Sequence, residues 1–147
     1  MTLPHATDPS GWDTLISDHA ALAAGVAAYC ARHGLDGRRA VRYPSGSLPV
    51  YAIGQEHVLK LFPPHEAGYA AIEARALAAV HGRLSIPTPR LIAADRLNGW
   101  HCLLMSQLHG RRLVDAWPEL SSAELERIAD QLGTALAALH ALDTRAL

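Results

Sequence analysis

Lys60 is the first candidate for chemistry, because it lies within the apolar run Val58-Leu59-Lys60-Leu61-Phe62. The alternation of a β-strand places Val58, Lys60 and Phe62 on one face of that run. A charged side chain is a poor filler for the interior of a domain, so a lysine here indicates either a function or a route to solvent. The plainer alternative is an edge-strand lysine whose ammonium reaches water or discourages edge pairing.

Glu73 is the candidate partner of Lys60. It lies in the middle of a helix predicted over residues 66–81, near enough to the inner face of that helix to reach the sheet. A Lys–Glu ion pair would fix the ammonium where it can bind the α- and β-phosphates of a nucleotide, and so supply charge where phosphoryl transfer concentrates it. The alternative is that Glu73 makes only a local contact on the helix surface.

The elements that would position this pair begin with a helix and three short strands. An alanine-rich helix is predicted from Asp18 to Arg32, with Asp18 as its N-cap and Gly34 as its stop. Short β-type runs separated by turn residues then predict an antiparallel meander over residues 40–43, 48–53 and 57–62.

The helix over residues 66–81 and a hairpin complete the predicted sheet region. Helical periodicity predicts that the packed face of the helix consists of Tyr69, Ile72, Ala76, Leu77 and Val80. Asn98-Gly99 predicts a type I′ hairpin between strands over 91–96 and 100–106. The expected fold class is therefore α+β, with a five-stranded antiparallel sheet and one inserted helix, flanked by an N-terminal and a C-terminal helix.

The last strand leaves the sheet through Gln107-Leu108-His109-Gly110 toward a helical region. A strand that exits between two bodies exposes backbone N–H and C=O groups, and these can hydrogen-bond the edge of an adenine. The alternative is a simple linker in which Gly110 permits a turn.

A capping box at Ser121-x-x-Glu124 predicts a final helix. The apolar stripe of this helix consists of Leu125, Ile128, Leu132, Leu136 and Leu139. We expect the helix to belong to a second, mostly helical body, without which the stripe would be exposed or buried against another chain. A homodimer or a complementing chain bound through this helix is therefore an expected partner.

Composition and charge argue against several function classes. The net charge of −1 provides no broad positive field, so neither nucleic acid nor a membrane is an expected partner. The N-terminus does not resemble a signal peptide, so a cytoplasmic location is expected. Cys30 and Cys102 are predicted to be buried or free thiols, and the histidines complete no zinc pattern, so no metal site is expected.

Four segments, taken in order, resemble a known family. They are a first hairpin over 45–51, the lysine strand over 58–62, residues 72–77 with 86–91, and residues 103–106 with Gly110. Their order and spacing are similar to those of the aminoglycoside phosphotransferase group, which includes choline-kinase-like enzymes and whose small lobe shares the protein-kinase fold. The resemblance extends from Arg39 to Ala141.

The resemblance implies a site for ATP or GTP with Mg²⁺. It makes Lys60 the phosphate-binding lysine, Glu73 its helix partner, and Met105 the residue before the hinge. Val58, two residues before the lysine, would cover the face of the adenine.

Backbone groups and a loop complete the implied nucleotide site. The backbones of Ser106 and Leu108 would contact adenine. Ser45, Gly46 and Ser47 would lie over the phosphates, although this segment departs from the G-x-G-x-x-G of protein kinases.

The resemblance also implies catalytic residues that the sequence does not contain. Phosphoryl transfer in this fold needs an aspartate that orients the acceptor hydroxyl, a nearby asparagine, and a second aspartate for Mg²⁺. No His-x-Asp occurs, and the only asparagine, Asn98, lies in the predicted hairpin turn. No catalytic residue and no metal ligand is therefore assigned, and the chain alone is expected to be inactive.

The expected organisation is an N-terminal helical extension over 1–35, a nucleotide-binding small lobe and hinge over 36–110, and the start of a truncated helical large lobe over 111–147. The leading hypothesis is the ATP-binding lobe of a phosphotransferase that moves the γ-phosphate to a hydroxyl of a small molecule, aminoglycoside-like or other. The alternative is a non-catalytic, pseudokinase-like interaction module or a subunit of a split enzyme.

Overall fold

The computed structural model describes residues 3–4 and 11–142, and its centre is one antiparallel sheet of five strands in the order β1-β2-β3-β5-β4. The strands are β1 (Ala40–Arg42), β2 (Val50–Ile53), β3 (His57–Phe62), β4 (Leu91–Leu97) and β5 (Trp100–Ser106). One helix, α3 (Ala67–Val80), is inserted after β3. The predicted α+β class, with five antiparallel strands and an inserted helix, is confirmed.

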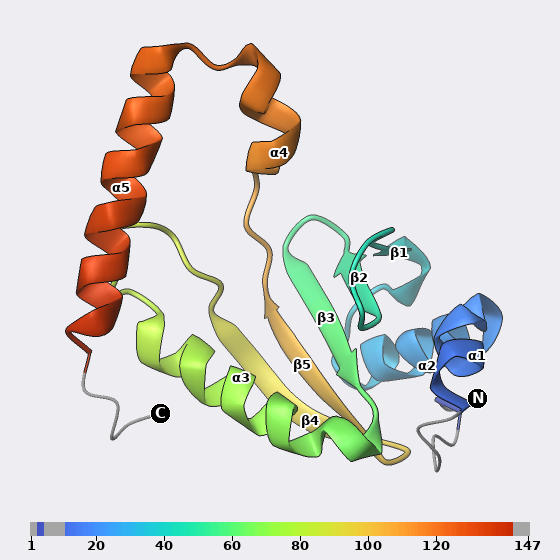
Figure 1. Cartoon of the computed structure of the whole chain (residues 1–147). Helices are drawn as coiled ribbons and strands as arrows, with labels where there is room; N and C mark the ends of the chain where they lie inside the picture. The colour runs from blue at the N-terminus through green and yellow to red at the C-terminus, as the bar shows by residue number, and fades with distance from the viewer. Residues whose placement is uncertain (1–2, 5–10, 143–147) are drawn as a thin grey trace.

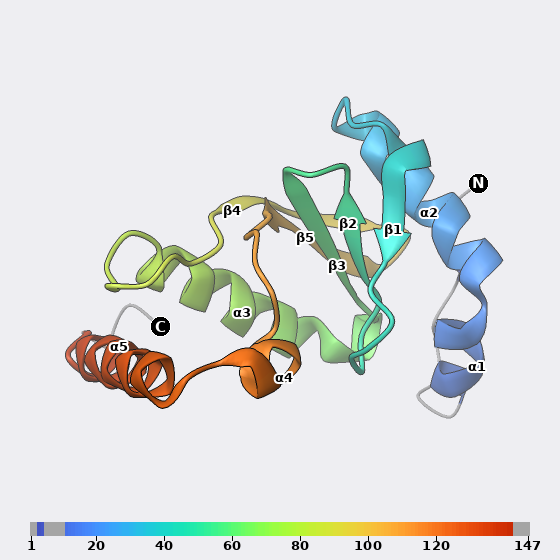
Figure 2. The same ribbon diagram turned by 90° about the horizontal axis from the view of Figure 1, so that it is seen from above.

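Helices lie on both faces of the sheet (Figures 1 and 2). The remaining helical elements are α1 (Trp12–Ser17), α2 (His19–Arg32), η2 (Gly37–Arg39), η3 (Pro64–Glu66), α4 (Leu113–Ala116), η4 (Trp117–Glu119) and α5 (Ser122–His140). In Figure 2 the sheet lies between α3 on one side and α1 and α2 on the other. The chain then leaves β5 toward α4 and α5, which lie away from the sheet (Figure 1).

The predicted helix ends and hairpin turn are present. The Asp18 side chain accepts a hydrogen bond from the Ala21 N–H at 3.0 Å and so caps α2. Ser121 and Glu124 form both hydrogen bonds of the predicted capping box at the start of α5. Asn98 and Gly99 have φ angles of 53° and 86°, which are the left-handed values that a type I′ turn requires.

Two hydrophobic clusters lie on opposite faces of the sheet, because alternate side chains of β3 point in opposite directions. On the outer face, which α2 covers, Leu59 and Leu61 pack with Tyr29 and other apolar side chains. On the inner face, which α3 covers, Phe62 packs with other side chains, namely Ala70, Leu103 and Met105. The inner cluster is the smaller one, and Lys60 lies on the same side of β3.

The N-terminal segment contributes to the outer cluster. Leu3 is fully buried, and its backbone carbonyl accepts a hydrogen bond from the Asn98 side chain. The neighbouring Pro4 carbonyl accepts a bond of 2.7 Å from the Trp100 indole. The β4–β5 hairpin therefore holds this segment against α2, where Gly25 leaves the space that Leu3 occupies.

The predicted packed face of α3 is wrong in part. Tyr69 and Ile72 are 68% and 54% exposed, whereas Ala70 is the buried residue of the helix, and Ala74 and Leu77 pack beside it. The physical reason is the apolar, alanine-rich composition of α3. A helix that is apolar on nearly every side gives periodicity no clear basis for choosing between faces.

The predicted stripe of α5 is largely uncovered. Leu132, Leu136 and Leu139 are exposed, and Ala135 is the buried residue among the described residues of the helix. No helix in the described part of the chain is long and apolar enough to cross a bilayer. The two cysteines, Cys30 and Cys102, are buried free thiols, as predicted.

Candidate functional site

Lys60 and Glu73 form an ion pair on the inner face of the sheet. The Lys60 Nζ lies 2.6 Å from the Glu73 Oε2, and the two side chains are 24% and 33% exposed. The same ammonium lies 4.9 Å from the centre of the Phe62 ring, a distance at which a cation is attracted to an aromatic face. The ammonium is therefore held by two neighbours and remains accessible to a ligand.

The position of this pair in the fold excludes two alternatives, an edge-strand lysine and a glutamate that contacts only its own helix. β3 lies between β2 and β5, so Lys60 is in the central strand of the sheet and not at an edge. The Glu73 carboxylate bonds to the sheet and not to a neighbour on its own helix. A short connection, from Pro63 through η3, folds α3 back over the inner face and places Glu73 opposite the strand.

An apolar row crosses the inner face beside the lysine. Residues directly opposite each other on paired strands point to the same side of a sheet. The pairing therefore aligns, from β1 to β4, Val41, Ala52, Val58, Met105 and Leu91. Val58 and Met105 pack in the inner cluster, but Val41 is 66% exposed. The row forms an apolar surface that is uncovered at its β1 end.

Lys60 belongs to the next row of the inner face. Its direct neighbours are Val50 on β2 and Leu103 on β5. Beyond Val50, the Tyr43 N–H donates to the Val50 carbonyl at 2.9 Å, which brings the end of β1 alongside. A ligand that rested on the apolar row with one end and extended along the sheet would therefore meet the ammonium.

The hinge after β5 has both occupied and free backbone groups. The Ser106 N–H donates to the Arg90 carbonyl at 2.9 Å, and its hydroxyl accepts from the Arg90 N–H at 2.8 Å. The Gln107 N–H donates to the Glu56 carbonyl at 2.8 Å. Among the described residues the backbone of Leu108 has no hydrogen-bond partner, so its N–H and C=O are free to meet a base.

A cavity of about 510 Å³ separates the hinge from the end of β1. It is lined by Tyr43 and by the hinge and the residues after it, Gln107, Leu108, His109, Gly110, Arg111 and Arg112. The Gln107 Oε1 is buried without a hydrogen-bond partner in the described structure. Arg111 is bound by Glu119 and Arg112 by Asp115, both at 2.7 Å, so carboxylates already neutralise the two guanidinium groups.

The segment Ser45-Gly46-Ser47 lies in the exposed connection between β1 and β2. Gly46 has a φ of 123°, which an L side chain rarely adopts, so the turn depends on glycine. No hydrogen bond or ion pair links this segment to Lys60 in the structure. Its proposed place over the phosphates stays a prediction.

Sequence reasoning did not identify Tyr43, Val41 or Ala52 as members of this region. Val41 and Ala52 are brought to the inner face only by the β1–β2–β3 register, and Tyr43 is held beside Val50 by the backbone hydrogen bond that follows β1. The one local signal is an aromatic residue directly before the Pro44-Ser45-Gly46 turn.

A twisted antiparallel sheet of this order, with an inserted helix that pairs its glutamate to a central-strand lysine, defines a kinase-like small lobe. A family model described as the phosphotransferase enzyme family matches residues 39–147, and the chain belongs to that family. No curated protein and no solved structure matched the chain.

Proposed function

We propose that the inner face of the sheet binds a purine nucleoside triphosphate, ATP or GTP, together with Mg²⁺. In this proposal the chain is the nucleotide-binding lobe of a phosphotransferase that moves the γ-phosphate to a hydroxyl of a small molecule. The main support is the Lys60–Glu73 ion pair, because a cation fixed in this way stabilises phosphate charge. A cytoplasmic location, where both ATP and Mg²⁺ are available, belongs to the same proposal.

The proposal assigns a place on the inner face to each part of the nucleotide. The base rests on the apolar row beside Val58 and Met105, with its edge against the Ser106 carbonyl and the free Leu108 backbone. The hinge cavity, at about 510 Å³, is within the range of roughly 300–1,000 Å³ that small-ligand pockets occupy. The phosphates extend toward Lys60, with residues 45–47 above them.

Mg²⁺ enters this proposal with the phosphates. Within residues 3–4 and 11–142, no group of three His, Cys, Asp or Glu side chains lies close enough to hold a metal ion. Mg²⁺ typically keeps several waters and binds through substrate phosphates together with one or two carboxylates. The bound ion would neutralise the triphosphate, while Lys60 holds the nucleotide in place.

Calorimetric titration of the chain with Mg·ATP and Mg·GTP tests the proposal. We expect binding by the wild-type protein, and at least about tenfold weaker binding by Lys60→Ala, since a hydrogen bond to a charged group contributes roughly 1.5–3 kcal/mol. The matched control is Arg127→Ala, which removes an exposed cation from α5 and should leave affinity unchanged. Equal affinity of wild-type and Lys60→Ala proteins would show that Lys60 does not bind phosphate.

Chemical labelling provides a second test, because Lys60 is the only lysine in the sequence. An amine-acylating reagent can therefore modify one side chain and the N-terminus, and mass spectrometry separates the two products. We expect Mg·ATP to slow acylation of Lys60 and to leave the N-terminus unaffected. Equal protection of both amines would point to depletion of the reagent and not to binding.

A second candidate function is a non-catalytic interaction module or a subunit of a split enzyme. The observation that favours it is the uncovered side of α5, where Leu132 and Leu136 are 50% and 51% exposed. Exposed apolar side chains that gather along one helix are typical of a surface that binds another protein. A homodimer or a complementing chain would then cover this side of α5.

A further inference from the structure

A separate cavity lies between α3 and the β4–β5 pair, away from the hinge. Its volume is about 410 Å³. The helix provides one wall, made of Ala70, Ala71 and Ala74, and the strands provide the other, made of Ala94, Asp95, Arg96, His101 and Leu103. The cavity exists because α3 faces the sheet here with alanines, whose short side chains leave the space between helix and strands unfilled.

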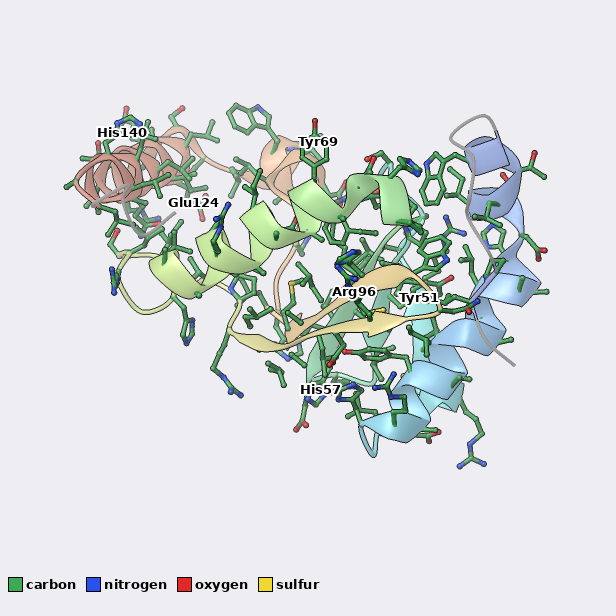
Figure 3. All side chains as sticks on the ribbon, turned by 90° about the horizontal axis from the view of Figure 1, so that it is seen from below. Tyr51, His57, Tyr69, Arg96, Glu124 and His140 are labelled. Carbon is green, nitrogen blue, oxygen red and sulfur yellow. The ribbon has the colours of Figure 1, made fainter. Side chains whose placement is uncertain are left out.

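Arg96 is the charged group of this cavity. It is the direct cross-strand partner of His101, which in turn pairs with Phe62 of the inner cluster, so Arg96 and His101 both point toward α3. Figure 3 shows Arg96 between α3 and the strand pair. Within the described structure the Arg96 guanidinium has no ion pair and no hydrogen bond, although its backbone carbonyl accepts one from Arg32.

The acidic neighbour does not neutralise Arg96. The Asp95 carboxylate is on the outer face, where it accepts a hydrogen bond of 2.9 Å from the Tyr29 hydroxyl and lies 3.1 Å from the His33 Nε2. Burial lowers the pKa of His101, and the charge of Arg96 lowers it further, so the imidazole is neutral at physiological pH. The cavity therefore has an apolar wall and, at its solvent-exposed side, one positive charge without an ion-pair partner in the described part of the chain.

We propose that this cavity binds a small organic anion, a carboxylate with a short apolar body. The carboxylate accepts hydrogen bonds from the Arg96 guanidinium, whose planar fork matches a carboxylate in two-point contact. The apolar body packs against the alanines of α3 and against Leu103. None of the residues placed in the nucleotide site above contributes to this lining, although Leu103 and Ala70 belong to the same inner cluster as Met105.

Nuclear magnetic resonance titration of the whole chain tests the proposal, with hexanoate, acetate and neutral hexanamide as probes. We expect hexanoate to shift the amide resonances of Ala70, Ala74 and Arg96, with a millimolar dissociation constant. Hexanamide and acetate should each bind at least about tenfold more weakly, because the first lacks the charge and the second lacks the apolar body. Equal affinity for hexanoate and hexanamide, or for hexanoate and acetate, overturns the proposal.

Two variants locate the site. Arg96→Gln should weaken hexanoate binding at least about tenfold through loss of the charged donor. Ala71→Leu should also weaken it, because a larger side chain at this exposed lining position fills the cavity while Arg96 remains. The matched control is Arg75→Gln, an exposed arginine on α3 outside the lining, which should bind hexanoate like the wild type. Wild-type binding by Arg96→Gln excludes this site.

The same ligand would act on the nucleotide site proposed above, because α3 provides both the cavity wall and Glu73. A ligand that fixes α3 against the sheet should tighten Mg·ATP binding in wild-type protein and leave it unchanged in Arg96→Gln, and the coupling must be reciprocal. The expected coupling to Mg·ATP binding rests on the proposed function, whereas the expected resonance shifts do not. Hexanoate binding without any change in nucleotide affinity would overturn the coupling but not the anion site.

Discussion

Burial on the outer face changes the acid–base behaviour of single residues. Desolvation, together with the smaller effect of the negative charge of Asp95, raises the pKa of the Cys102 thiol to about 12. Burial is also the main cause that raises the pKa values of Cys30, Tyr29 and Tyr51. All four groups are neutral when protonated, so the folded chain keeps these protons at a pH where an exposed group loses them.

We predict that the free energy of unfolding falls as the pH rises from about 9 toward 11. In this range the unfolded chain loses the Cys102 proton, because the ordinary thiol pKa is 9.0, whereas the folded chain retains it. The unfolded state then binds fewer protons, so alkali favours it. Urea unfolding at a series of pH values measures the slope, and Cys102→Ala should make it shallower. A slope that is unchanged in Cys102→Ala would contradict this assignment.

Residue types explain which site residues were predictable. Lys60 was identified because a lysine inside an apolar strand is chemically conspicuous, and its contact with Glu73 is present in the structure. Tyr43 and Arg96 were not identified, because an aromatic beside a turn and an arginine on a strand are ordinary in sequence. Their positions at the two cavities depend on strand register, which no local pattern specifies.

At the scale of elements, the contact between α2 and the N-terminal segment depends on a missing side chain. A Cβ on Gly25 would lie 2.3 Å from the Leu3 Cδ2 and 3.0 Å from the Leu3 Cα. Glycine in the middle of a helix costs about 1 kcal/mol relative to alanine. Here the absence of a side chain at Gly25 leaves room for Leu3, which is fully buried in the core.

We predict opposite effects for two glycine-to-alanine substitutions in helices. Gly25→Ala should lower the free energy of unfolding by roughly 1–3 kcal/mol, because overpacking exceeds the gain in helix propensity. Gly133→Ala in α5 should raise it by up to about 1 kcal/mol, because nothing lies within 4 Å of the added Cβ. Denaturant unfolding compares the two. Stabilisation of equal size in both variants would mean that Leu3 does not occupy this space in solution.

Helix ends and turns that neighbouring residues specify were predictable from the sequence. The side of a helix that packs against the sheet was not always predictable. Asp18, the Ser121–Glu124 box and Asn98-Gly99 each specify an end or a turn through neighbouring residues, and all are present. The face of α3 depends on which side meets the sheet, and an alanine-rich helix offers several similar choices. Leu77 was placed correctly and Tyr69 was not.

At the scale of the whole molecule, the sheet order is the feature that sequence leaves open. β5 lies between β3 and β4, and the pairing of Phe62 with His101 joins residues far apart in the chain. Such a contact is selected by the burial of both faces and not by any turn. The exposure of the α5 stripe, by contrast, was expected from the sequence, because its leucines repeat at helical spacing along one side of the helix.

We predict that the chain associates with itself through α5 at concentrations of roughly tens of micromolar, which corresponds to a modest free energy of association. Light scattering after size exclusion should show a mass that rises with concentration. The double variant Leu132→Ser/Leu136→Ser should stay monomeric and should unfold like the wild type, because both side chains are already half exposed. Glu126→Gln, a charge change on the same helix, is the control. A wild-type monomer at every concentration would contradict the prediction.

The central position of Lys60 also determines when a lysine-specific protease can cleave this protein. A protease that cleaves only after lysine has one peptide bond to cut in this sequence, and that bond lies inside β3 with a paired strand on each side. Fraying at the ends of the chain cannot expose it. Cleavage by such a protease therefore reports opening of the whole sheet, so its rate measures the global stability of the lobe and the stabilisation that any bound ligand provides.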